Sequence, residues 1–170
     1  MLQSITRIAL PALFLASAAS AQQFESWTTT TDGWNVFLNN KTGGCFAEYE
    51  DAAGNVLQIG TEAGLFFGGE STQFGFLAIY IPGSGSDGAV GPVTVDLGPE
   101  TYEAEGHTVS RDGYVGGYIV GKDQQFEKSL GDRREMVVTG PNYKTTVNLL
   151  NLGTAEAMEV VKTCQRRKGG

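Results

Sequence analysis

The sequence has few of the residues that catalytic and metal sites use most. Its 170 residues include one histidine, His107, and two cysteines, Cys45 and Cys164. A catalytic zinc site takes three protein ligands and relies on histidine. A cysteine nucleophile needs a nearby histidine or a C-x-x-C motif, and neither is visible in the sequence. We therefore predict that the protein is not an enzyme and holds no cofactor or metal.

The chain also lacks an apolar run of the roughly 20 residues that a membrane-spanning helix needs. The N-terminal run Ile8–Ala16 is about half that length and follows a single positive charge, Arg7. It precedes Ala19-Ser20-Ala21, the small-x-small pattern after which a signal peptidase cuts. Residues 1–21 are therefore predicted to be a cleaved bacterial signal peptide. We expect a periplasmic or secreted protein that is not inserted in a membrane.

Basic residues are scarce, with 12 Lys and Arg against 19 Asp and Glu, a net charge of −7. Loss of Arg7 with the signal peptide makes the net charge −8. Nucleic acids and anionic membranes attract positive surfaces, so the charge argues against both and favours a protein or small ligand, with basic surfaces on a protein partner. The sequence specifies neither the partner nor the oligomeric state. The cluster Arg166-Arg167-Lys168 ends the chain, and residues 166–170 are predicted to be a flexible tail.

The two cysteines are expected to pair, because thiols in exported proteins tend to form disulfides. A bond between Cys45 and Cys164 would enclose 118 residues. In the loop-entropy model, closure of so long a loop stabilises the fold by about 4–5 kcal/mol. The competing interpretation, a reactive thiol, lacks the neighbouring groups that would activate it. We predict a structural disulfide between Cys45 and Cys164.

Glycine is abundant, with 24 residues, about twice its usual share of ~7%. The glycines separate short runs rich in β-branched and aromatic residues, and several of these runs alternate between apolar and polar side chains. We predict a mainly β fold over residues 22–165. It is a single antiparallel sandwich or curved-sheet domain with one or two short C-terminal helices. The predicted strands are 34–38, 45–50, 56–59, 74–81, 92–97, 101–109, 114–120 and 143–149. We expect a turn at residues 51–55 to join 45–50 and 56–59 as a hairpin, and 101–109 to pair with 114–120 around a turn at residues 111–113.

Two segments carry helical signals. Asp123 is positioned to cap residues 124–130, where Phe126 and Leu130 lie four apart on one face. The later helix begins near Thr154, which we expect to act as its N-terminal cap. Its apolar stripe consists of Ala157, Val160, Val161 and Cys164. A bond from Cys164 to Cys45 would therefore fasten this helix to the N-terminal strands.

A glycine-rich stretch, residues 83–88, reads GSGSDG and matches the pattern G-x-G-x-x-G. In a dinucleotide-binding fold, the glycine turn leads directly into a helix whose N-terminus holds the pyrophosphate. Here Pro92 opens another predicted strand. We therefore expect a hairpin loop between the strands 74–81 and 92–97 and not a nucleotide site. The G-x-S-x-G nucleophile elbow is not matched either.

One strand candidate carries three alternating polar residues, Glu103, Glu105 and His107. Alternate residues of a strand share a face, and a Glu-x-His pair on a strand can bind a metal ion. The simpler interpretation is a solvent-facing polar stripe, which is our prediction. A metal-assisted or carboxylate-based hydrolase that uses these three residues is the alternative function.

Several residues are shared with a known family. Trp34-x-Val36, Cys45, the run from Gly54 to Ile59 and the C-terminal stretch from Val147 to Cys164 resemble invasion-associated locus B-type proteins. The resemblance implies a small exported bacterial protein with a β-rich fold, a strand followed by a helix near the C-terminus, and cysteines in bridges. It implies a host-interaction or envelope role and no catalytic residues. The family often has a further cysteine shortly after W-x-V, where this chain has Leu38. We therefore expect a non-catalytic, envelope-associated or host-interaction binding module.

Overall fold

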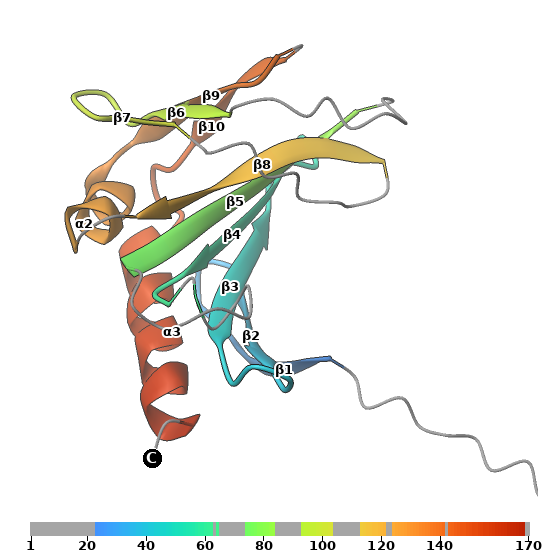
Figure 1. Ribbon diagram of the computed structural model, residues 1–170, viewed down its shortest axis with the longest axis vertical. Coiled ribbons are helices and arrows are strands. Elements are labelled where there is room, and N and C mark those ends of the chain that lie inside the picture. Colours follow the sequence, from blue (N-terminus) through green and yellow to red (C-terminus); the bar gives the residue numbers. More distant parts are fainter. Residues whose placement is uncertain are drawn as a thin grey trace, which may run out of the picture.

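A computed structural model of the chain shows ten strands and two helices in the part that it describes (Figure 1). That part comprises residues 23–62, 64, 74–83, 93–103, 113–121, 124–141 and 143–168. The predicted signal peptide lies outside it. The elements are β1 (Phe24–Thr29), β2 (Asn35–Asn39), β3 (Cys45–Glu50), β4 (Val56–Gly60), β5 (Phe74–Pro82), β6 (Thr94–Asp96), β7 (Thr101–Glu103), β8 (Tyr114–Gly121), α2 (Gln124–Asp132), β9 (Glu135–Thr139), β10 (Lys144–Asn148) and α3 (Thr154–Lys168).

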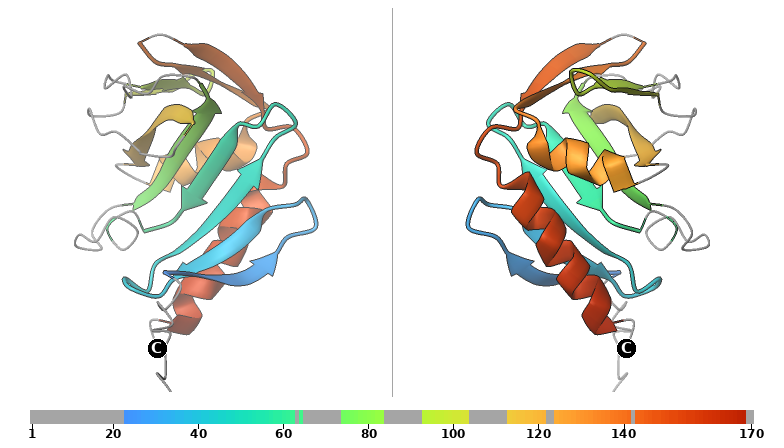
Figure 2. Two further views of the ribbon diagram at one scale, coloured as in Figure 1. Left: turned by 90° about the vertical axis from the view of Figure 1, so that its right-hand side faces the viewer. Right: turned by 90° about the vertical axis from the view of Figure 1, so that its left-hand side faces the viewer.

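The strands form two antiparallel sheets. Sheet A has six strands in the order β1-β2-β3-β4-β5-β8, and sheet B has four in the order β10-β9-β6-β7. Both helices lie on the same face of sheet A, as the two views in Figure 2 show. The prediction of a mainly β, antiparallel fold with a helix at the C-terminal end is confirmed. No helix in the described ranges is long and apolar enough to cross a membrane.

The hairpin of β3 and β4 shows how local sequence determines structure. The carboxylate of Asp51 accepts hydrogen bonds from the backbone N–H groups of Ala53, at 2.8 Å, and Asn55, at 2.9 Å. Gly54 adopts φ = 80°, a left-handed conformation that favours glycine. Aspartate and glycine therefore fix the turn that the sequence predicted between residues 51 and 55.

The main core lies between sheet A, sheet B and the two helices. Residues of β2 to β5 that point toward the helices are buried together with residues of β6, β9, α2 and α3. The largest fully buried side chains include Trp34, Phe126 and Met136. At the ~25 cal/mol per Å² expected for apolar burial, these large side chains are the main source of stability. The stripe predicted on the last helix is confirmed for Ala157, Val161 and Cys164, all at 0% exposure.

Two predicted strand pairings are wrong. Strands β5 and β6 flank the glycine-rich stretch, but β5 pairs with β4 and β8 while β6 pairs with β7 and β9. The stretch therefore lies in a connection between the two sheets and is not a hairpin loop; residues 84–92 of this connection lie outside the described part. Likewise, β7 and β8 belong to different sheets. In each case the consecutive strands separate because their apolar faces cover opposite sides of one core.

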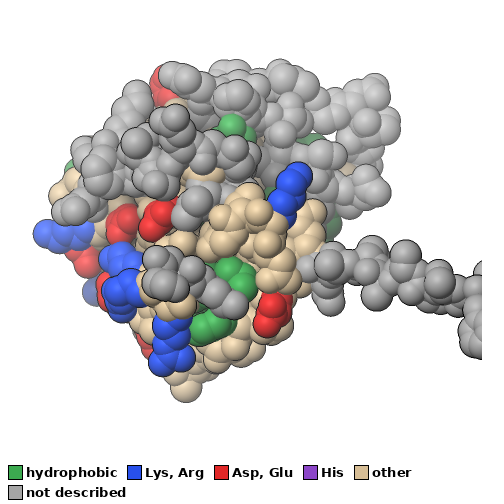
Figure 3. Space-filling view, turned by 60° about the horizontal axis from the view of Figure 1, so that its bottom comes forward, with side chains coloured by type: hydrophobic (Ala, Val, Ile, Leu, Met, Phe, Trp, Pro, Cys, Tyr) green, Lys and Arg blue, Asp and Glu red, His purple; other side chains and the backbone are tan. Residues whose placement is uncertain are grey.

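The C-terminal end also differs from the expectation of a flexible tail after residue 165. Helix α3 continues through Arg166 and Arg167 to Lys168. Cationic side chains in the last turn favour the negative end of the helix dipole, and the Cζ atom of Arg167 lies 5.9 Å from the centre of the Trp27 ring. Figure 3 shows most of the Lys and Arg side chains of the face that it presents on one side, interspersed with Asp and Glu. The basic cluster is therefore part of the folded helix.

Candidate functional site

The Glu-Glu-His candidate falls mostly outside the described residues. Glu103 is the last residue of β7 and is exposed. Glu105 and His107 lie beyond it, in residues 104–112, which the structure does not describe. Within the described ranges, no group of three or more His, Cys, Asp and Glu side chains is placed to hold a metal ion. The structure therefore leaves this candidate a prediction.

The predicted disulfide is present. The sulfur atoms of Cys45 and Cys164 are bonded at 2.02 Å, and both residues are almost fully buried. The neighbouring Gln165 adds two hydrogen bonds to the same region. Its Oε1 accepts from the backbone N–H of Cys45 at 2.9 Å, and its Nε2 donates to the carbonyl oxygen of Gly43 at 3.2 Å. The C-terminal half of α3 is thus held to the start of β3 by one covalent bond and two hydrogen bonds.

The N-terminal end of α3 is fastened to the turn between β1 and β2. The indole Nε1 of Trp34 donates to the carbonyl oxygen of Leu152 at 2.5 Å, and the hydroxyl of Thr31 donates to Glu156 at 3.3 Å. The predicted cap is wrong, because the Oγ1 of Thr154 is buried without a hydrogen-bond partner among the described residues. Instead, the carbonyl oxygen of Gly153 accepts the first helical bond, from Ala157 N–H at 2.9 Å.

Helix α2 is held to sheet B by polar contacts around Glu100, which precedes β7. The hydroxyl of Ser129 donates a hydrogen bond to the Glu100 carboxylate, which also accepts one from Arg133 at 3.3 Å. The Ser129 hydrogen bond, joined by the hydrogen bond and charge of Arg133 and opposed by partial burial, holds the pKa of Glu100 below 4.5. Glu100 is therefore ionised at neutral pH and fixes the position of α2.

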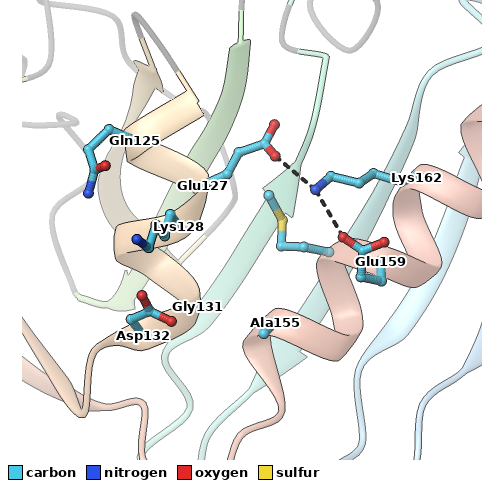
Figure 4. Close-up of a pocket in the computed structure, with 9 residues that line it drawn as sticks. Gln125, Glu127, Lys128, Gly131, Asp132, Ala155, Glu159 and Lys162 are labelled. Carbon is cyan, nitrogen blue, oxygen red and sulfur yellow. Dashed lines mark hydrogen bonds and ion pairs between the residues drawn. The ribbon is translucent and has the colours of Figure 1, made fainter.

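The two helices enclose a groove with a volume of about 720 Å³ (Figure 4). The two helices are close together at Gly131, where an added Cβ atom would lie 3.2 Å from the Cβ atom of Ala155. Met158 is nearly buried, with 3% of its surface exposed. The lining residues are Gln125, Glu127, Lys128, Gly131, Asp132, Ala155, Met158, Glu159 and Lys162.

An ion-pair bridge crosses this groove. The Lys162 ammonium on α3 lies 3.1 Å from Glu127 on α2 and 3.0 Å from Glu159 one turn away, as the dashed lines in Figure 4 mark. Burial alone would lower the pKa of Lys162, but the hydrogen bonds and charges of Glu159 and Glu127 outweigh it and raise the pKa above 10.5. Lys162 therefore stays charged at neutral pH and keeps both carboxylates in place.

The chemistry of the lining favours binding a polar chain. Small-molecule pockets are lined mainly by apolar and aromatic side chains, whereas five of the nine residues here are charged. The two lysines and three carboxylates offer both donors and acceptors along an open groove. Such a lining suits a peptide segment of a protein partner.

Sequence reasoning did not identify this groove. Helix 124–130 and the last helix were both predicted, and Glu159 and Lys162 are three residues apart, a spacing that favours an ion pair within one helix. Glu127 and Lys162, however, are 35 positions apart. Their contact depends on how α2 packs against α3, and the sequence carries no local signal for it.

The chain was compared with protein families, curated proteins and solved structures, and no match was found in any of the three.

Proposed function

We propose that this protein is a non-catalytic binding module that acts in the periplasm or outside the cell and holds a peptide segment of a protein partner between α2 and α3. The observation that carries the proposal is the charged groove on two firmly attached helices. Binding sites on fixed elements lose less conformational entropy when the partner binds. The disulfide and Gln165 hold α3, while Glu100 holds α2.

Two further observations support the location and role. A buried disulfide is typical of proteins in oxidising compartments, and residues 1–21 have the pattern of a signal peptide. The resemblance to invasion-associated locus B-type proteins points to the same envelope or host-interaction role, and membership in that family is part of the proposal. The hydrolase alternative, with Glu103, Glu105 and His107, has no supporting observation in the described residues.

Charge reversal in the groove tests the proposal. Asp132 and Glu159 are exposed, so changing both to Arg alters the groove with little effect on the core. The matched control reverses Glu25 and Glu50, exposed acids on β1 and β3. Wild type and both variants are used to capture partners from envelope extract, with quantification by mass spectrometry. We expect a partner that wild type and control recover equally and that the groove variant recovers at least tenfold less.

Equal recovery by the groove variant would contradict the proposed surface. The non-catalytic role is tested separately against peptidase, esterase, glycosidase and phosphatase substrates. Turnover that disappears in Glu103→Gln or His107→Ala would establish the hydrolase alternative instead.

A further inference from the structure

Strand β10 lies at an edge of sheet B and has β9 on one side and no described strand on the other. Its pairing with β9 is regular over all five residues. An edge strand of this kind presents unpaired N–H and C=O groups to any second extended chain.

Two hydrogen bonds show which residues of β10 face outward. Gly140 N–H bonds to the Tyr143 carbonyl at 2.9 Å, and Leu149 N–H bonds to the Arg134 carbonyl at 2.7 Å. Bonded pairs alternate along an antiparallel ladder, so Thr145 and Val147 also bond to β9. The backbone groups of Lys144, Thr146 and Asn148 therefore point away from β9. These three residues are also the exposed ones of the strand.

We infer that this edge pairs with the same edge of a second copy of the chain, forming a two-fold dimer centred on Thr146. With Thr146 opposite its symmetry mate, Lys144 lies opposite Asn148 of the other copy. All three outward-facing residues then form bonded pairs, which gives about six backbone hydrogen bonds. A shift by one pair leaves only two bonded pairs. The central register also avoids placing Lys144 opposite another Lys144, and it places two threonines together, a favourable cross-strand pair.

The charges across this pairing are complementary. Asn148 lies opposite Glu135 on β9, so Lys144 of one copy is two strands away from Glu135 of the other. That separation is about 10 Å, within the combined reach of the two side chains. Within one copy, Lys144 and Glu135 lie at opposite ends of the five-residue ladder. The ion pair is therefore available only between copies, and the symmetry supplies it twice.

The other sheet edges are less suited to such pairing. Strand β1 has a register shift between Ser26 and Thr28, and an irregularity of this kind interrupts an edge. Strand β7 has three residues, and β8 has glycine at three of its eight positions, which weakens a strand. Among the four edges of the sheets that the described strands form, β10 is the regular one with self-complementary side chains.

Cysteine cross-linking tests both the dimer and its register, because the two natural cysteines are already bonded to each other. Residues of a bonded antiparallel pair lie with Cα atoms about 5.5 Å apart, which suits a disulfide. We expect Thr146→Cys to cross-link to itself under mild oxidation. Lys144→Cys and Asn148→Cys should cross-link with each other in a mixture and much less when alone. Equal cross-linking of all three variants alone would overturn the register.

Sedimentation equilibrium of the unmodified protein provides the second measurement. We expect a concentration-dependent dimer whose dissociation constant rises about tenfold in Lys144→Glu and in Glu135→Lys, because each reversal acts twice. The double variant should recover wild-type affinity. Thr146→Pro should abolish the dimer while leaving the monomer folded, because the N–H that it removes points outward. A wild-type protein that is monomeric at near-millimolar concentration, or a double variant that does not recover, would overturn the inference.

Discussion

The two sheets are attached to their helices by different kinds of interaction. Sheet A is joined to α3 by the Cys45–Cys164 bond and by the Trp34 indole, which bonds to Leu152. Sheet B is joined to α2 through the partly exposed Glu100, which accepts a hydrogen bond from Ser129 on α2 and pairs with Arg133, the residue after α2. The first attachment is covalent and buried, so it responds to reduction. The second is ionic and open to solvent, so it responds to pH and salt.

Buried polar atoms without hydrogen-bond partners also distinguish the two sheets. Three described side chains have a buried polar atom without a hydrogen-bond partner in the described part of the chain: Arg133, Tyr143 and Thr154. Arg133 and Tyr143 flank the strands of sheet B, and Thr154 begins α3. An unsatisfied buried polar group costs about 1–3 kcal/mol. We therefore expect sheet B and α2 to open before sheet A and α3 in native-state hydrogen exchange.

The largest expected effect follows from removing the disulfide. Replacing both Cys45 and Cys164 by Ala should lower the free energy of unfolding by about 2–5 kcal/mol, because the unfolded chain regains the freedom of a long loop. Urea unfolding under non-reducing conditions measures this loss. Hydrogen exchange should show that α3 loses protection and approaches the level of α2. A loss below about 1 kcal/mol, with α3 still the better protected helix, would contradict the comparison.

Local sequence patterns account for the elements that were predicted well. The bounds of β3 match the prediction because polar and apolar residues alternate through Cys45–Glu50 and a turn with Asp51 and Gly54 follows. Strand β1 was not predicted: it lies at an edge and none of its residues is fully buried, so its apolar pattern is weak. Strand β9 was not predicted either, although its two buried residues, Met136 and Val138, alternate with less buried ones in the pattern of a half-buried strand.

Contacts between residues far apart in the sequence were predicted only where the chemistry of the residues left few possible partners. Because the sequence contains only two cysteines, one intramolecular pair is possible, so Cys45–Cys164 could be predicted. The pairing of β5 with β8, and the meeting of Glu127 with Lys162, had no such restriction. Both result from packing two apolar faces around one core, and several strand orders satisfy the same alternation.

A smaller effect is expected from Glu100→Gln, which weakens the ionic attachment of α2. The pKa of Glu100 is lowered in the folded protein, so the unfolded chain takes up its proton first as the pH falls. The stabilisation by ionised Glu100 is therefore present above pH 4.5 and is lost as the pH falls through the lower folded pKa.

The variant should accordingly be less stable than wild type at pH 7, and the difference should shrink in acid. Urea unfolding of wild type and variant at pH 7 and at pH 3 measures the loss of stability and its decrease in acid. The control is Glu103→Gln, which removes an exposed carboxylate on the neighbouring strand β7. A difference that is the same at both pH values would show that Glu100 acts by packing and not by charge.

The smallest effect concerns Tyr143, at the start of β10, whose buried hydroxyl has no partner among the described residues. Because removal of an unsatisfied hydroxyl costs no hydrogen bond, Tyr143→Phe should leave the free energy of unfolding at pH 7 unchanged or raise it by up to about 1 kcal/mol.

Burial raises the pKa of Tyr143 above 10 in the folded protein. The unfolded chain therefore loses this proton first, and wild type loses stability as the pH rises beyond 10. The variant should lose less over the same range, since it lacks the ionisable group. Urea unfolding at pH 7 and at pH 10.5 tests both statements, with Tyr114→Phe on sheet A as the control. A clear loss of stability at pH 7 would mean that the hydroxyl has a partner, and Arg133 alone would then flank sheet B with an unsatisfied buried polar atom.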